Sequence, residues 1–143
     1  MATLPRTVTY DEWLAMPEID EGREEVVNGD VQFLPPPKLP HADVISELLF
    51  TILAQVDRKL VKVLPAEFGL IIRRDPLTSR SPDLAVFWKA GMVFKDGYCH
   101  SAPDLVIEVI SSSETRSRKL AKLADYAGIG VPEAWLLDPR RRT

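Results

Sequence analysis

The chain has 143 residues, of which 45% are apolar, and a formal net charge of −3. This length and apolar content suffice for one domain with its own hydrophobic core. The acidic balance excludes a protein that binds nucleic acid through an overall positive charge, so any such contact must be local. The candidates for a local basic patch lie in the C-terminal third: Arg116, Arg118, Lys119, Lys122, Arg140, Arg141 and Arg142.

The single cysteine and the N-terminal segment indicate where the protein works. One cysteine, Cys99, excludes an internal disulfide framework and a structural zinc cluster, and it fits a reducing compartment. The N-terminal "MATLPRTVTYDEW" lacks the apolar core and cleavage site of a signal peptide. No apolar run approaches the roughly 20 residues that a membrane helix needs. We expect a soluble cytoplasmic protein with no membrane contact.

The first predicted elements are a short helix and a β-hairpin. Thr9 and Glu12 form a capping-box pattern, which predicts a helix that begins near Tyr10 and ends before Pro17. In "EEVVNGDVQFL", Asn28-Gly29 separates two strand-like runs and is the strongest short-range signal for a hairpin. The run of three prolines that follows ends this strand, because proline cannot donate to a ladder.

The middle of the chain predicts a long helix and then strands. From residue 41 to residue 60 apolar residues recur at intervals of three and four, which is typical of an amphipathic helix. "VKVLPAEFGLIIRR" and "PDLAVFW" are strand-like and are separated by the turn-rich "RDPLTSRS". Residues 89–101 are expected to form an exposed loop or a weak hairpin.

The last third predicts a strand, a helix and a second strand. "DLVIEVIS" is continuously apolar except for Glu108, as expected of a central strand that is covered on both faces. Residues 114 to about 127 form the predicted helix, and "EAWLLDP" the next strand; such a unit predicts a parallel pair with a right-handed crossover. The chain is one mixed α/β domain. The predicted apolar face of the helix consists of Leu120, Leu123, Ala124 and Ala127.

The carboxylate of Glu108 raises a physical problem. Burying an unpaired carboxylate costs several kcal/mol, so a cation, a set of hydrogen-bond donors or a metal ion must face it. Asp83 follows Pro82 at the start of the preceding strand, and two carboxylates on neighbouring strands can share a hard ion such as Mg²⁺. Lys122, on the following helix, can orient an attacking water and stabilise charge that develops on a phosphate.

Simpler interpretations of the same residues stay open. Asp83 after a proline can merely cap a loop, because aspartate side chains satisfy nearby backbone donors. Glu108 and Lys122 can form a structural ion pair in the core. Tyr126, one turn after Lys122, can donate a hydrogen bond to a carboxylate or only pack. His41 can simply sit near a helix N-terminus.

The ordered set of motifs resembles a known family. Pro-Asp, a glutamate within a strand and a later lysine are the pattern of the PD-(D/E)xK nuclease superfamily, and the spacing is similar to that of the Uma-type family of restriction-endonuclease-like proteins. The resemblance runs from about Tyr10 to Pro139. It is carried by "EVVNGD" from Glu25, "PPPKLPH" to His41, "SPDLAVF" around Asp83, "APDLVIEVIS" around Glu108, then Lys122, Tyr126 and "GVPEAWLLDP".

The resemblance implies a fold, an activity and a set of roles. The implied fold is mixed α+β: a restriction-endonuclease-like central mixed sheet flanked by helices, with an N-terminal helix and β-hairpin. The implied activity is Mg²⁺- or Mn²⁺-dependent endonucleolytic hydrolysis of DNA by a homodimer. The implied metal ligands are Asp83, Glu108 and the Val109 carbonyl, with Lys122 as the catalytic lysine and Glu25 as an auxiliary acid; His41 would border the pocket.

The chain departs from the family pattern at three places. Ile110 stands where the superfamily lysine would follow the glutamate, and Glu114 and Arg118 stand where relatives carry threonine and aspartate. Because relatives continue with further strands after "DPRRRT", residues 1–143 are expected to be one domain without the family's C-terminal strands. An alternative is a catalytically inactive nuclease-fold module that binds nucleic acid or a protein partner. A purely structural protein is a third alternative.

Overall fold

The computed structural model describes residues 7–18, 22–66, 68–111 and 114–141. In these ranges the strands form two mixed sheets, one of six strands in the order β2-β1-β5-β4-β8-β7 and one of four in the order β10-β9-β6-β3. No helix in the same ranges has the length and apolar content to cross a bilayer. The helices are α1 (Tyr10–Ala15), α2 (Leu39–Leu53) and α3 (Arg116–Gly128), with a 3₁₀ turn at Lys89–Gly91. The strands are β1 (Arg23–Val27), β2 (Asp30–Leu34), β3 (Val61–Pro65), β4 (Leu70–Arg73), β5 (Thr78–Arg80), β6 (Leu84–Trp88), β7 (Phe94–Lys95), β8 (Tyr98–Cys99), β9 (Leu105–Val109) and β10 (Glu133–Leu137).

The N-terminal helix and hairpin have the predicted local causes. Helix α1 begins after Thr9, whose hydroxyl oxygen accepts a hydrogen bond from the amide of Glu12 at 3.2 Å. Strands β1 and β2 pair antiparallel around Asn28 and Gly29, whose φ angles are +49° and +82°. A two-residue turn with both φ angles positive matches the right-handed twist of a hairpin. Both predictions are confirmed.

Helix α2 covers one face of the four-stranded sheet but is shorter than predicted. It begins at Leu39 and ends at Leu53, seven residues before the predicted end. Beyond the helix the chain turns at Asp57, whose side chain accepts a hydrogen bond from the amide of Lys59 at 2.9 Å and whose carbonyl accepts from the amide of Val61. This turn redirects the chain into β3, so the apolar residues after α2 belong to a connection.

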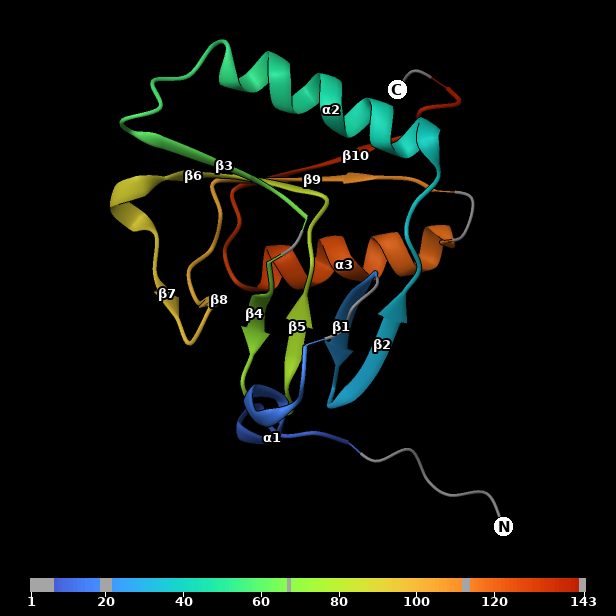
Figure 1. Cartoon of the computed structure of the whole chain (residues 1–143), viewed down its shortest axis with the longest axis vertical. Coiled ribbons are helices and arrows are strands. Elements are labelled where there is room, and N and C mark those ends of the chain that lie inside the picture. Colours follow the sequence, from blue (N-terminus) through green and yellow to red (C-terminus); the bar gives the residue numbers. More distant parts are fainter. Residues whose placement is uncertain (1–6, 19–21, 67, 112–113, 142–143) are drawn as a thin grey trace.

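The four-stranded sheet has one helix on each face (Figure 1). In β9 the side chain of Ile107 packs in the cluster beneath α2, whereas Val106 packs with Tyr126 of α3. Because side chains alternate along a strand, Glu108 faces α3. Strand β10 runs parallel to β9 with Leu136 beside Glu108, and α3 makes the crossover, as predicted.

The buried face of α3 is not the predicted one. Of the predicted apolar residues only Leu123 packs against the core; Leu120 is 47% exposed, whereas Lys119, Lys122 and Tyr126 are buried. The reason is the sheet face that α3 covers, because it carries Glu108 and therefore requires cations and donors in place of leucine. The sequence pattern therefore predicts the helix correctly, but it does not predict which side of the helix faces the sheet.

Two other segments differ from or refine the predictions. The turn-rich "RDPLTSRS" contains β5, a buried strand between β1 and β4 that the sequence pattern did not indicate. Residues 89–101 hold the predicted weak hairpin, formed by β7 and β8, with Cys99 fully buried at its end. Helix α1 packs against the six-stranded sheet through Tyr10 and Trp13.

Substitution of Gly29 tests the hairpin. Gly29 and Gly97 share a φ of +82°, but a Cβ at Gly29 would lie 2.8 Å from Cβ of Thr7, whereas Gly97 faces open space. Gly97→Ala is expected to lower the free energy of unfolding by about 1–2 kcal/mol through the backbone alone. Gly29→Ala should lose more, as measured by urea denaturation. Equal losses would show that the contact with Thr7 is unimportant.

Candidate functional site

Asp83 lies where the chain passes from β5 in one sheet to β6 in the other. Its side chain is buried and every contact is with a donor. Oδ1 accepts a hydrogen bond from Arg23 Nη1 at 3.0 Å, and Oδ2 accepts from the backbone amide of Val109 at 2.7 Å. His41 Nε2 is 3.2 Å from Oδ2. The carboxylate therefore joins β1, α2 and the end of β9.

Glu108 is fully buried on β9 and faces α3. The hydroxyl of Tyr126 donates to its Oε1 at 2.5 Å, and Lys119 Nζ donates to its Oε2 at 2.8 Å. The same ammonium lies 3.2 Å from Asp83 Oδ2. Lys119 therefore bridges the two carboxylates, and their oxygens converge on its nitrogen.

A second group of charges adjoins the first. Lys122 Nζ lies 3.2 Å from Glu25 Oε1 and 2.7 Å from Glu114 Oε1, as charge contacts outside ideal hydrogen-bond angles. Glu25 Oε2 accepts from the amide of Ser81 at 2.8 Å. The other oxygen of Glu114 is 3.1 Å from Lys119 Nζ. Glu114 therefore connects the two buried lysines.

The environment separates the proton affinities of the two central carboxylates. Burial raises the pKa of Asp83, but the hydrogen bond with His41 and the charge of Lys119 outweigh it and hold that pKa well below the usual range. Burial and the neighbouring charge of Asp83 raise the pKa of Glu108 to about 7, against the opposing charges of the two buried lysines. Asp83 is thus the permanently ionised member of the pair.

The surrounding groups respond to these carboxylates. Burial lowers the pKa of Lys119, yet the charges of Glu108 and Asp83 outweigh burial and raise it above its ordinary value. Burial, followed by the charge of Glu108, raises the pKa of Tyr126 well above 10.0, so its hydroxyl stays a donor. Lys119 remains an ammonium and Tyr126 a neutral phenol across the physiological range.

The structure brings most of the predicted site residues together, but in two subgroups. Asp83 and Glu108 share a contact through Lys119, whereas Lys122 and Glu25 contact each other and neither of those two carboxylates. His41 contacts Asp83 directly. Val109 participates through its amide; a role for its carbonyl as a metal ligand stays a prediction.

Three cations of the site are not among the predicted residues: Lys119, Arg23 and Arg80. Arg23 holds Asp83, and Arg80 contacts Glu25 at 3.5 Å and Asp125 at 2.7 Å. For Lys119 a signal exists in the sequence. Lys119, Lys122 and Tyr126 recur at intervals of three and four, so they form one polar stripe on the helix that follows a buried glutamate.

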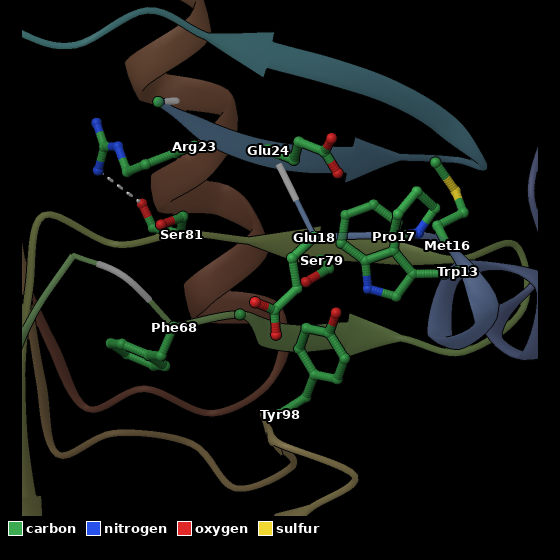
Figure 2. Close-up of a pocket in the computed structure, with 12 residues that line it drawn as sticks. Trp13, Met16, Pro17, Glu18, Arg23, Glu24, Phe68, Ser79, Ser81 and Tyr98 are labelled. Carbon is green, nitrogen blue, oxygen red and sulfur yellow. Dashed lines mark hydrogen bonds between the residues drawn. The ribbon is translucent and has the colours of Figure 1, made fainter. Parts of the chain in front are cut away.

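The opening beside the partners of these carboxylates is small. A pocket of about 50 Å³ borders His41, Arg23, Glu114 and Arg118, which leaves room for an ion or a few waters. A larger cleft of about 370 Å³ is also bordered by Arg23. Figure 2 shows this cleft, with Arg23 and Ser81 at one end and the rings of Trp13 and Tyr98 at the other.

The donor set of the site fits a divalent ion under one condition. In the described ranges no group of three or more histidine, cysteine, aspartate or glutamate side chains is arranged to hold a metal. Asp83 and Glu108 nevertheless supply two convergent carboxylates, and Mg²⁺ commonly takes one or two carboxylates and completes its shell with water and phosphate. Because Lys119 Nζ stands at the point of convergence, the ion fits only if that ammonium moves away.

The comparisons with known proteins agree on family and fold. The sequence model of the Uma2 family, described as "Putative restriction endonuclease", matches residues 10–143. The crystal structure of "a putative nuclease belonging to DUF820" from Anabaena variabilis is similar with a TM-score of 0.77 and 24% sequence identity, covering 93% of this chain and 75% of that one. No curated protein matches this chain. The predicted family and the nuclease-like mixed α+β fold are confirmed.

The raised pKa of Glu108 predicts how stability depends on pH. The folded protein binds this proton more tightly than the unfolded chain, so the contribution is complete below about pH 4.5 and is lost as pH rises through about 7. The loss can reach roughly 3 kcal/mol. Glu108→Gln mimics the protonated acid and should flatten this part of the profile, measured by urea denaturation in EDTA from pH 5 to 8. An unchanged slope in the variant would contradict the assignment.

Proposed function

The chain belongs to the Uma2 family, and from this premise we propose that it is an endonuclease that hydrolyses DNA phosphodiester bonds with Mg²⁺ or Mn²⁺. The observation that supports this proposal best is the convergence of Asp83 Oδ2 and Glu108 Oε2 on one cation at the ends of neighbouring strands. Two carboxylates on one cationic centre match the demand of a divalent ion.

Each polar side chain then has a role. Asp83 and Glu108 would hold the ion, which supplies polarisation of a phosphate oxygen and a lowered pKa of bound water. Arg23 and the amide of Val109 orient Asp83, and Tyr126 orients Glu108. These contacts fix the geometry of both carboxylates while Asp83 Oδ2 and Glu108 Oε2 stay directed at Lys119 Nζ.

Lysine supplies the remaining positive charge. In the proposed mechanism Lys122 offsets charge on the phosphate, with Glu25 as the auxiliary acid that positions it at 3.2 Å. Arg80 in turn orients Glu25 and holds Asp125 on α3. The buried contacts of Glu25 with three donors support this positioning role.

Arginines near the same edge favour a nucleic-acid backbone as substrate. A cleft of about 340 Å³ runs between the start of α3 and the end of β10 and is bordered by Arg116, Arg140 and Arg141. Arg118 borders the small opening beside His41 and Glu114. Guanidinium groups pair with phosphate oxygens, and such binding weakens with salt. A local basic edge is compatible with the net charge of −3.

A homodimer is part of this proposal, because two sites in one particle can cut both strands of a duplex in a single encounter. The edge of the four-stranded sheet supports it. Strand β10 pairs with β9 on one side only among the described strands, and Trp135 on β10 is 40% exposed. An open edge strand with an exposed aromatic residue favours pairing with another copy.

A second candidate function is nucleic-acid binding without turnover. The observation that favours it is Lys119, which already satisfies both carboxylates in the arrangement described above. Such a module would bind DNA with the same salt dependence and release no product.

The nuclease proposal predicts metal-dependent cleavage that depends on the two carboxylates. Plasmid or oligonucleotide cleavage should require added Mg²⁺ or Mn²⁺ and stop in EDTA. Asp83→Asn and Glu108→Gln should each lower the rate by about a hundredfold or more, because each removes a charge that would hold the ion. Asp43→Asn on the exposed side of α2 is the matched control and should cleave normally.

Two outcomes would count against this proposal. Cleavage that survives both substitutions would show that the activity resides elsewhere or in a contaminant. Salt-dependent DNA binding with no product at any divalent ion tested would favour the binding module.

A further inference from the structure

We infer that Lys119 is an internal cation that occupies the divalent-ion position between Asp83 and Glu108, so that the ion binds only when the Lys119 ammonium withdraws. This inference rests on the proposed metal site and adds a regulating residue to it. It concerns a lysine that is distinct from Lys122, the residue to which the catalytic role is assigned above.

The geometry excludes simultaneous occupancy. Lys119 Nζ is 2.8 Å from Glu108 Oε2 and 3.2 Å from Asp83 Oδ2. Mg²⁺ bound to the same two oxygens would sit about 2.1 Å from each, which places it in the volume of the ammonium. The outer oxygens offer no alternative, because Arg23 holds Asp83 Oδ1 and Tyr126 holds Glu108 Oε1.

The charges of the site lead to the same conclusion. In the connected network of buried and half-buried side chains, five carboxylates face four lysine and arginine side chains and one histidine. The network is therefore nearly neutral before any ion arrives. A divalent ion gains less from a neutral site than from one with excess negative charge, so Lys119 should weaken binding wherever it stays in place. The carboxylates are Glu25, Asp83, Glu108, Glu114 and Asp125; the cations are Arg23, Arg80, Lys119 and Lys122.

Glu114 gives the displaced ammonium a partner. Its Oε2 is already 3.1 Å from Lys119 Nζ, and Glu114 borders the small opening with a side chain that is 11% exposed. If Lys119 turns away from Asp83 and Glu108, it keeps this contact and avoids becoming an unpaired buried charge. Withdrawal of the Lys119 ammonium therefore costs its contacts with Asp83 and Glu108, but leaves it paired with Glu114.

The test compares divalent-ion affinity in three variants on the same helix. Titration calorimetry with Mn²⁺ on the full chain reports binding directly, without reference to cleavage. Lys119→Met keeps the length of the side chain and removes its charge, so Mn²⁺ should bind at least about tenfold more tightly than to wild type. Lys119→Arg keeps the charge and should bind no more tightly than wild type.

Lys122→Met is the matched control for removal of a buried positive charge. Lys122 is as buried as Lys119 and also contacts Glu114, but it contacts neither Asp83 nor Glu108. The change in Mn²⁺ affinity that Lys122→Met causes should be clearly smaller than the change that Lys119→Met causes. A double variant with Lys119→Met and Asp83→Asn should lose the tight binding, which shows that the ion sits between the two carboxylates.

Stability provides a second readout if Lys119→Met folds poorly. Removing the ammonium leaves two facing carboxylates, so this variant should melt at a lower temperature than wild type in EDTA. Mn²⁺ should restore the melting temperature, because it replaces the missing charge. Failure of Mn²⁺ to restore a folded protein would overturn the inference.

The outcomes separate this inference from the proposed function. Suppose that wild type binds Mn²⁺, but Lys119→Met binds it no more tightly or Lys119→Arg binds it more tightly. Lys119 then does not compete with the ion, while the metal site stands. If neither wild type nor Lys119→Met binds Mn²⁺, the metal site itself is wrong and the inference falls with it. Tighter binding in Lys119→Met alone supports both.

Discussion

The arrangement of the site depends on one constraint: two carboxylates, Asp83 and Glu108, are buried within reach of a single cation. Water would stabilise these charges outside the protein, so the fold must supply donors to every oxygen. It does so with Arg23, Tyr126 and Lys119, which come from a strand of one sheet and from the helix that packs on the other. The burial of two lysines on α3, at the expense of Leu120, is a direct consequence.

The two sheets meet at these buried carboxylates, where hydrogen-bond donors are needed. The chain leaves β5 of the six-stranded sheet and enters β6 of the four-stranded sheet at Asp83, and α3 lies against the second sheet while also contacting β4 of the first (Figure 1). Charges from both sheets therefore converge beneath one helix. A hydrophobic contact at this junction would tolerate small shifts, whereas ion pairs and hydrogen bonds require defined distances and angles. The polar network thus specifies how the sheets and α3 fit together.

The sequence predicts local structure and the central carboxylates, and it misses what depends on tertiary context. Thr9, Asn28 and Gly29 act through neighbouring residues, so their helix cap and turn could be inferred directly. Glu108 could be identified because a charge interrupts an apolar strand. Lys119 could not be chosen over Lys122 by spacing alone, because the choice depends on how α3 is rotated over β9. Strand β5 is short and polar in sequence, and only its place between β1 and β4 makes it a strand.

The most direct test of the metal site is a crystal structure of the protein grown in the presence of Mn²⁺. The diffraction data are recorded at a wavelength at which manganese gives an anomalous signal. We expect an anomalous peak between Asp83 Oδ2 and Glu108 Oε2, with the Lys119 ammonium withdrawn toward Glu114. Manganese bound with Lys119 still 2.8 Å from Glu108 would contradict the competition between them. A site with Lys119 in place and no manganese at saturating concentration would contradict the metal centre itself.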